Sequence, residues 1–270
     1  MSLNHEKLKV YQRALTFNAK VCEWTSGWDK RHAIGDQLDR AAGSIIENVA
    51  MSSASISRMK VICVEYAIGS TLECAACLDL SRIKGLLDAD TVQSGKYEVL
   101  QVVRMLIGLR KAWLSVPVVA ENRSEYAEGE ANLFHHERLD VYRLALEVAT
   151  LLEYSSSIKQ LADVAHRRID ELLTSMVLNI AEGNGRYSEV DQSRFAQMSR
   201  GAAVKLAARL DLLMVRGCIS QKEADRIKVH LERLSTMLMA MSPGGQYPHT
   251  TAKFATTFTT KESIAGRYAR

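Results

Sequence analysis

Four basic residues in the last third of the chain are spaced so that they share one face of a helix. The stripe consists of Arg194, Lys205, Arg209 and Arg216. At about 100° per residue these positions fall within roughly 60° of one another. An apolar face lies to one side, formed by Phe195, Leu206, Leu210 and Leu213. Such a stripe can follow nucleic-acid phosphates and release their counterions. The alternative is a solvated helix face with local acidic partners such as Asp191.

A weaker basic signal lies near the start of the chain. Lys9, Arg13 and Lys20 fall on one face of the first expected helix. Together with the stripe, these residues are the candidates for contact with RNA.

Cys74 and Cys77 form a Cys-x-x-Cys spacing inside an apolar segment. No second cysteine pair or nearby histidine completes a zinc site, so zinc or redox chemistry is only the alternative. The five cysteines fit no disulfide framework and are expected to be reduced, buried small hydrophobes. His5, His135 and His136 lack a metal-binding partner four residues on, and we expect them to cap helices or face solvent. We expect no metal and no cofactor.

Catalytic arrangements are not evident in the sequence. No glycine-rich phosphate loop, His-Glu-x-x-His motif, nucleophile elbow or carboxylate pair stands out. The glutamates of the first half are spaced unlike those of a di-iron bundle. The sequence therefore predicts a protein without catalytic residues.

The elements that carry these residues occur twice. The segment 5–15 returns as 136–146, and 44–50 returns as 175–181, both at a shift of 131 positions. Further on, Asp79 and Leu80 meet Asp211 and Leu212 at a shift of 132, which needs one inserted residue. A constant offset over this length indicates two copies of one domain, each able to bury its own core.

Each copy is expected to be a four-helix bundle. Only three prolines occur, none of them within a repeat, which favours an all-α protein. The expected helices cover about 5–24, 29–51, 57–85 and 88–113, and then about 136–154, up to 182, 188–217 and 220–242. Short turns between them favour an up-down-up-down order in both copies.

Local signals mark several helix ends. Gly85 and Gly183 are expected to adopt the left-handed conformation after a helix. Asp88 is a good N-cap, the serines at 155–157 supply a turn and cap, and Ser188 begins the third helix of the second copy. Ser220 and Glu223 have the spacing of a capping box.

The chain therefore divides into four parts. These are a bundle at 1–117, an acidic linker at 118–134, a second bundle at 135–243 and a Thr-rich basic tail at 244–270. The tail is expected to be flexible, or alternatively an arm that adds to a partner. We see no signal peptide and no apolar run typical of a membrane span, and we expect a cytoplasmic protein without a membrane partner.

Three short sequence motifs occur in the two copies, completely or in part. The opening signature stands at 8–14 and again at 139–145. A core signature of the form QLxRAAxSIxxNIAEGxGR is kept at its start in 37–45 and at its end in 179–186. A Gly-Ser followed by Glu stands at 69–73 and has become 201–205 in the second copy. By these motifs both copies resemble the four-helix-bundle family of 23S rRNA intervening-sequence proteins, the S23 family. That family includes the accessory variability determinant of diversity-generating retroelements.

The resemblance implies a helical bundle that assembles into rings, typically of five, associates with structured RNA or a reverse transcriptase, and has no known enzymatic activity. An odd ring cannot consist wholly of chains that each add two bundles to it. The motif residues that it marks as structural are Arg40, Ser44, Asn48, Gly69, Glu73, Asn179, Glu182, Gly183, Gly185 and Arg186. For the segment around Gly183, a structural junction is favoured over a ligand site.

The third helix of the first copy is apolar nearly all round, which predicts that it is covered on more than one side. The candidate interface residues, between copies or between subunits, are Ile62, Tyr66, Gly69 and Ala76.

Two functions remain open from the sequence. The first is a non-enzymatic oligomeric adaptor that binds structured RNA or a protein–RNA complex through basic helix faces. The second is a scaffold without nucleic-acid binding that recruits a partner through the apolar third helix of the first copy. In both, the chain also has itself as a partner, as a homo-oligomer or an internal pseudo-dimer.

Overall fold

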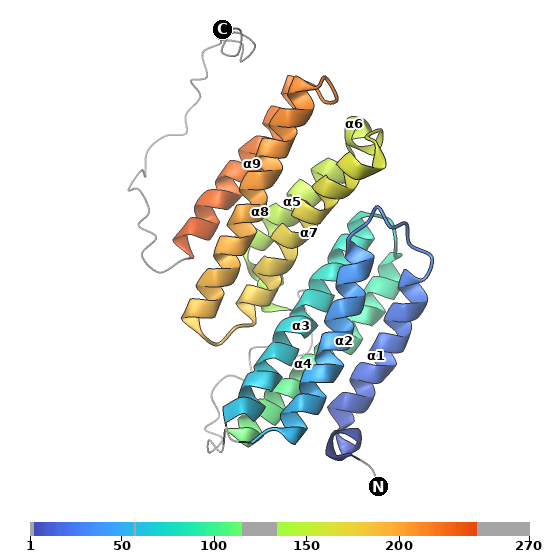
Figure 1. The fold of residues 1–270 in the computed structure, drawn as a ribbon, viewed down its shortest axis with the longest axis vertical. Helices are drawn as coiled ribbons and strands as arrows, with labels where there is room; N and C mark the ends of the chain where they lie inside the picture. Colours follow the sequence, from blue (N-terminus) through green and yellow to red (C-terminus); the bar gives the residue numbers. More distant parts are fainter. Residues whose placement is uncertain (1–2, 57, 115–133, 242–270) are drawn as a thin grey trace.

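The computed structural model describes residues 3–56, 58–114 and 134–241, and its regular elements in these ranges are helices (Figure 1). Copy 1 contains η1 (Asn4–Lys7), α1 (Lys9–Thr25), α2 (Ile34–Ala54), α3 (Arg58–Ile83) and α4 (Ala89–Trp113). Copy 2 contains η2 (His135–Arg138), α5 (Asp140–Glu153), α6 (Ser156–Lys159), α7 (Asp163–Asn184), α8 (Glu189–Val215) and α9 (Gln221–Ala240). The predicted all-α fold with two tandem bundles is confirmed. The tail and nearly all of the predicted linker lie outside the described residues.

The two copies share one arrangement of helices. In copy 1 each helix packs on the next in sequence, and α4 returns to α1. In copy 2 the helices α5, α7, α8 and α9 pack in the same cyclic order. The short α6 has no counterpart, so the second long helix of copy 2 begins at Asp163 rather than directly after the serines.

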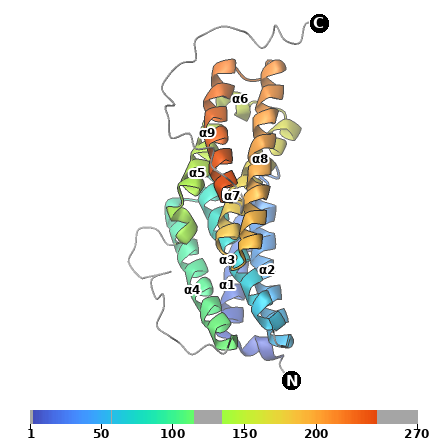
Figure 2. The ribbon, with the colours of Figure 1, turned by 90° about the vertical axis from the view of Figure 1, so that its left-hand side faces the viewer.

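The copies lie against each other with α3 at the centre of the molecule (Figures 1 and 2). Helix α3 packs between α2 and α4 of its own copy and also contacts α7 and α5 of copy 2. The buried apolar residues of both copies form one continuous core. Helix α3 is long and apolar enough to cross a membrane, but 78% of its apolar window is buried within the molecule. Its composition thus fits a helix enclosed by other helices.

Local end signals are partly realised. Gly85 has a φ of 66°, and the side chain of Asp88 accepts a hydrogen bond of 2.8 Å from the Thr91 backbone N–H. The capping box of α9 is half formed, because Ser220 Oγ accepts from the Glu223 N–H at 3.2 Å while the Glu223 carboxylate accepts from the Ser155 hydroxyl instead. Ser188 begins α8 without a side-chain cap bond.

The expected left-handed conformation of Gly183 is wrong. Gly183 lies inside α7, and only Gly85 and Gly217 have positive φ among the glycines of the described ranges. A Cβ on Gly183 would lie 2.8 Å from Cβ of Phe195, so the glycine lets α7 and α8 approach closely. Its requirement comes from packing and not from the backbone conformation of a cap.

Candidate interface between the two copies and basic face of helix α8

Small residues let α3 and α7 approach at the junction of the copies. A Cβ on Gly69 would lie 3.1 Å from Cζ of Arg186, and a Cβ on Gly185 would overlap Cδ1 of Leu72. Of the other predicted interface residues, Ala76 is completely buried and Ile62 is half-buried. Tyr66 remains 49% exposed, and its ring lies 4.9 Å below the guanidinium carbon of Arg186. The family-motif glycines Gly69 and Gly185 are thus placed where the two copies meet, whereas Gly183 packs within copy 2.

A buried group of charges surrounds this contact. Glu73 of α3 faces Glu182 and Arg186 of α7, and Arg186 forms an ion pair with Glu182. Burial, reinforced by the Glu182 charge, raises the pKa of Glu73 to about 7, against the opposing influence of Arg40 and Arg186. Burial also raises the pKa of Glu182 despite its pairing with Arg186. The junction therefore has two carboxyl groups that resist ionisation because they are desolvated together.

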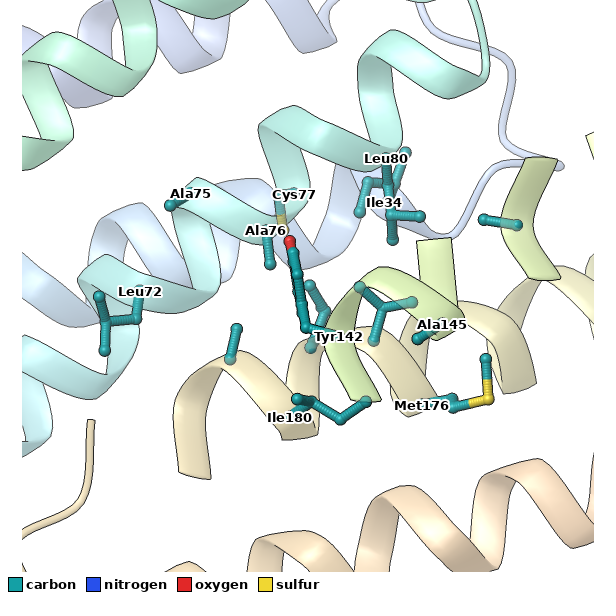
Figure 3. Packing of buried hydrophobic residues seen from close by; sticks show 14 of the residues in the cluster. Ile34, Leu72, Ala75, Ala76, Cys77, Leu80, Tyr142, Ala145, Met176 and Ile180 are labelled. Atoms are coloured by element: carbon teal, nitrogen blue, oxygen red, sulfur yellow. The ribbon is translucent and has the colours of Figure 1, made fainter. Parts of the chain in front are cut away.

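A second polar group links α3, α4 and α5 farther along the junction. The Tyr142 hydroxyl, which points from α5 towards α3 in Figure 3, donates a 2.8 Å hydrogen bond to Asp79. Lys96 of α4 donates to Asp79 at 2.6 Å and also pairs with Glu137 of copy 2. Burial alone would lower the pKa of Lys96, but the Asp79 and Glu137 carboxylates outweigh it and raise that pKa. The lysine is therefore held as an ammonium between the two copies.

His136 lies beside this group, and the expectation that it caps a helix or faces solvent is wrong. It is completely buried, stacked on Phe134 at 5.6 Å between ring centroids and edge-on to Tyr142 at 4.7 Å. Burial, together with the charge of Lys96, lowers the pKa of His136 to about 3, so the ring is neutral. Phe134, assigned above to the linker, is also buried here.

The side chains of Asp79, His136 and Glu137 have potential ligand atoms within 4.8 Å of one another. A metal ion would need the space between these carboxylates. The ammonium of Lys96 already contacts both of them, so it supplies the positive charge that a metal would bring.

A buried ion pair closes the end of the junction near α2. Lys84, just after α3, pairs with Asp170 of α7, and their side chains are only 4% and 3% exposed. The second carboxylate oxygen of Asp170 accepts a 2.7 Å hydrogen bond from the Ala33 backbone N–H of copy 1. Removing either partner of such a desolvated ion pair would leave the other charge buried and unpaired, which destabilises the folded state.

The serine and asparagine of the core motif have the same structural role in both copies. Asn179 Nδ2 donates to Ser175 O at 2.6 Å and to its hydroxyl at 3.2 Å. Asn48 makes the same two bonds to Ser44 at 2.8 and 3.1 Å. Ser44 also bonds to the Ser70 hydroxyl at 2.9 Å, which ties α2 to α3. These hydrogen bonds therefore connect successive turns of α2 and of α7 and, through Ser44, neighbouring helices of copy 1.

The basic stripe lies along the outer side of α8. Arg194, Lys205 and Arg216 are exposed, and Arg209 is half-buried with no hydrogen-bond partner for Nε. None of the four forms an ion pair with the part of the chain that the structure describes. The face also exposes Met198 and Val204, at 47% and 53%. It combines free cations with apolar side chains.

The basic residues of α1 are placed differently from the stripe. Arg13 and Lys20 pair with Glu98 of α4 at 3.1 and 3.2 Å, while Lys9 is exposed. Two of these three candidates therefore connect helices within copy 1, which argues against an open phosphate-binding face there.

The cysteines fall into two groups. Cys63, Cys74 and Cys77 are buried, and burial raises the pKa of the Cys74 and Cys77 thiols well above its usual value. Cys22 and Cys218 are exposed, contrary to the expectation that all five are buried. The buried pair is suited to packing and not to thiolate chemistry.

The residues that join the copies were largely missed from the sequence, apart from the motif positions. The sequence marks Asp79 only as a repeated residue, and it does not by itself predict contacts between the copies for Lys84, Lys96, Tyr142 or Asp170. A signal was available, because each has a residue of the same type, or an arginine for a lysine, at the corresponding position of the other copy.

The comparison with known families agrees with the two-copy organisation. The family model described as 23S rRNA-intervening sequence protein matches residues 6–108 and, a second time, residues 137–240. No curated protein and no solved structure matches the chain.

Proposed function

This chain belongs to the 23S rRNA-intervening sequence protein family, and from that premise we propose that it is a non-enzymatic adaptor for structured RNA or a protein–RNA complex. The observation that carries the proposal is the set of cations on α8, none of which forms an ion pair with an acidic side chain of the described residues. From Arg194 to Arg216 the stripe extends about 33 Å at 1.5 Å per residue. That length suits a row of phosphates along a folded RNA.

The apolar third helix of copy 1 is a poorer candidate for recruiting a partner. Helix α3 contacts α2, α4, α5 and α7, so its apolar surface is largely used within the chain. A scaffold that recruits its partner through α3 would need surface that the other helices of the chain already contact.

The test is binding of a structured RNA by fluorescence anisotropy over a range of salt concentrations. Each phosphate contact that is lost should reduce the salt dependence of log K by about 0.7–0.9. We expect Arg194→Glu with Lys205→Glu to weaken binding at least tenfold and to flatten the salt dependence.

The matched control reverses Arg167 and Arg168 on α7, which are both exposed and pair with Glu171. It makes the same change in net charge away from α8. An equal loss in both double variants would indicate general electrostatic attraction, and an unchanged affinity of the α8 variant would refute the proposed RNA-binding face.

A further inference from the structure

Two histidines face each other where the copies meet near the start of α2. His32 stands in the turn between α1 and α2, and His166 lies in the first turn of α7, beside that turn (Figure 1). Their ring centroids are 5.9 Å apart at an interplanar angle of 79°, so one ring presents its edge to the other. Each copy therefore contributes one imidazole to this histidine pair.

The histidine pair lies against the buried ion pair of the junction. Ala33, the residue after His32, donates its backbone N–H to Asp170. His166 precedes Asp170 by four residues, which places both on one face of α7. A cavity of about 20 Å³ beside His166 is lined in part by Lys84 and Asp170. It has room for about one water molecule, which is too little to hydrate a further cation from that side.

The charged groups around the histidine pair are already matched with one another. They come from the α1–α2 turn, the end of α3, α5 and α7, and they are Asp29, Arg31, Lys84, Glu153, Asp163 and Asp170. Each of the four carboxylates in this set forms an ion pair with a lysine or an arginine. Within the described residues, Nδ1 of each histidine is buried without a hydrogen-bond partner. A proton added to either ring would therefore create a cation that has no carboxylate of its own.

These surroundings keep the histidine pair neutral to lower pH than an exposed histidine. Burial lowers the pKa of His32 and of His166, Lys84 adds to this lowering, and Asp170 opposes it without reversing it. Separated and exposed, the two rings would take up protons near the ordinary pKa of about 6.5. The separated form therefore gains free energy relative to the closed form as the pH falls below about 6.5.

We propose that His32 and His166 form a pH-sensitive contact, which keeps this end of the junction closed while both rings are neutral and lets it open when acid protonates them. Opening moves the α1–α2 turn away from the start of α7 and breaks the hydrogen bond between Ala33 and Asp170. The inference goes beyond the proposed RNA binding, because it concerns the contact between the two bundles and does not involve the cations of α8.

The opening is local because the other part of the junction responds to pH in the opposite direction. Glu73 lies ten residues before the end of α3, about 15 Å along that helix. Acid keeps its buried carboxyl group neutral, which stabilises the contact of α3 with α7 there. Acidification therefore opens the junction at the histidine pair while the part around Glu73 stays together.

The backbone amide of Ala33 reports this opening directly. Its hydrogen exchange is measured by NMR in the full chain at about pH 5.5 and pH 7.5 and converted to a protection factor with the intrinsic rate at each pH. One pH unit below its ordinary pKa, each imidazole that the closed form keeps neutral favours the open form about tenfold. We expect the protection of Ala33 to be at least tenfold lower at the acidic pH, while amides in the middle of α9 retain theirs.

Two double variants separate the histidine pair from other titrating groups. His32→Gln with His166→Gln removes both imidazoles and should keep the protection of Ala33 within about twofold between the two pH values. The matched control, His5→Gln with His230→Gln, removes one histidine from each copy away from this contact and should show the same acid loss as the wild type.

Three results would overturn the inference. An equal loss of protection in α9 would indicate that the whole chain unfolds in acid. A loss that persists without His32 and His166 would assign the effect to another group. Finally, NMR titration of these two imidazoles in the wild-type chain needs no variant, and pKa values at or above about 6.5 would show that closing the junction does not disfavour their protonation.

Discussion

Helices α3 and α8 occupy the same place in their bundles but have different surroundings. Helix α3 is covered on its outer side by copy 2, and α8 leaves that side open. At corresponding positions Glu73 and Cys77 of α3 are replaced by Lys205 and Arg209 of α8. The bundle alone therefore does not determine the composition of its third helix; the neighbouring bundle does.

The comparison also separates two kinds of polar residue. Some, such as Asn48 and Asn179, make the same bonds in both copies because they organise a single bundle. Others, such as Asp79 and Asp211, are retained in both copies but have a cross-copy partner in only one. Substitutions at the second kind of position should therefore have unequal effects in the two copies.

The largest expected difference concerns the buried ion pair of the junction. Asp170→Ala leaves the Lys84 ammonium buried without its partner and removes the acceptor of the Ala33 N–H. We expect the free energy of unfolding to fall by about 3–5 kcal/mol, measured by urea denaturation. Asp39→Ala, the exposed counterpart, should change it by less than about 0.5 kcal/mol in dilute solution. Equal losses would show that the two positions are not distinguished by burial.

A smaller difference should appear with pH. The pKa of Glu73 is raised to about 7, so the folded protein binds a proton that the unfolded chain releases near its ordinary value. This contribution to stability is present at acidic pH and is lost as the pH rises through 7. Between pH 5 and pH 8, the free energy of unfolding of the wild type should fall by about 2 kcal/mol more than that of Glu73→Gln.

Comparison with that variant is needed because His136 is present in both proteins, and its lowered pKa makes the free energy of unfolding rise with pH. Lys205→Gln, the same amide at the corresponding place on α8, is the matched control and should retain the wild-type pH dependence. Parallel pH profiles for wild type and Glu73→Gln would contradict a protonated Glu73.

The smallest effect concerns packing. Gly185→Ala places a methyl group against Leu72 and should destabilise the protein by about 1–2 kcal/mol in thermal unfolding. Val204 and Ala54 stand at the positions of the repeat that correspond to Leu72 and Gly185. Adding Leu72→Val gives the same pair of side chains and should restore most of the lost stability. Gly201→Ala, in open space on α8, should be neutral or slightly stabilising. A double variant no more stable than Gly185→Ala would show that the two side chains do not compensate.

The parts of the fold predicted correctly are those determined by short-range signals and by the repeat. Asp88 and Gly85 act within one turn of their own helix ends, so their sequence context is sufficient. The role of Gly183 is not predictable in this way, because the need for glycine there comes from Phe195 on another helix. The partner of Arg13 and Lys20 is Glu98, far along the chain, and single-sequence spacing gives no information about that contact.

The junction was only partly predictable for the same reason. The apolar composition of α3 indicated a covered helix, but nothing in one copy shows that α5 and α7 of the other provide the cover. The burial of His136 depends on Phe134 and on charges of copy 1, which local sequence does not specify.

The presence of both bundles in one polypeptide has a consequence for dilution. Their mutual contact is intramolecular, so it is governed by an effective local concentration that does not change when the protein is diluted. Contacts between separate chains have no such protection and weaken as the protein becomes scarce. At low protein concentration the two bundles of one chain would therefore remain in contact with each other.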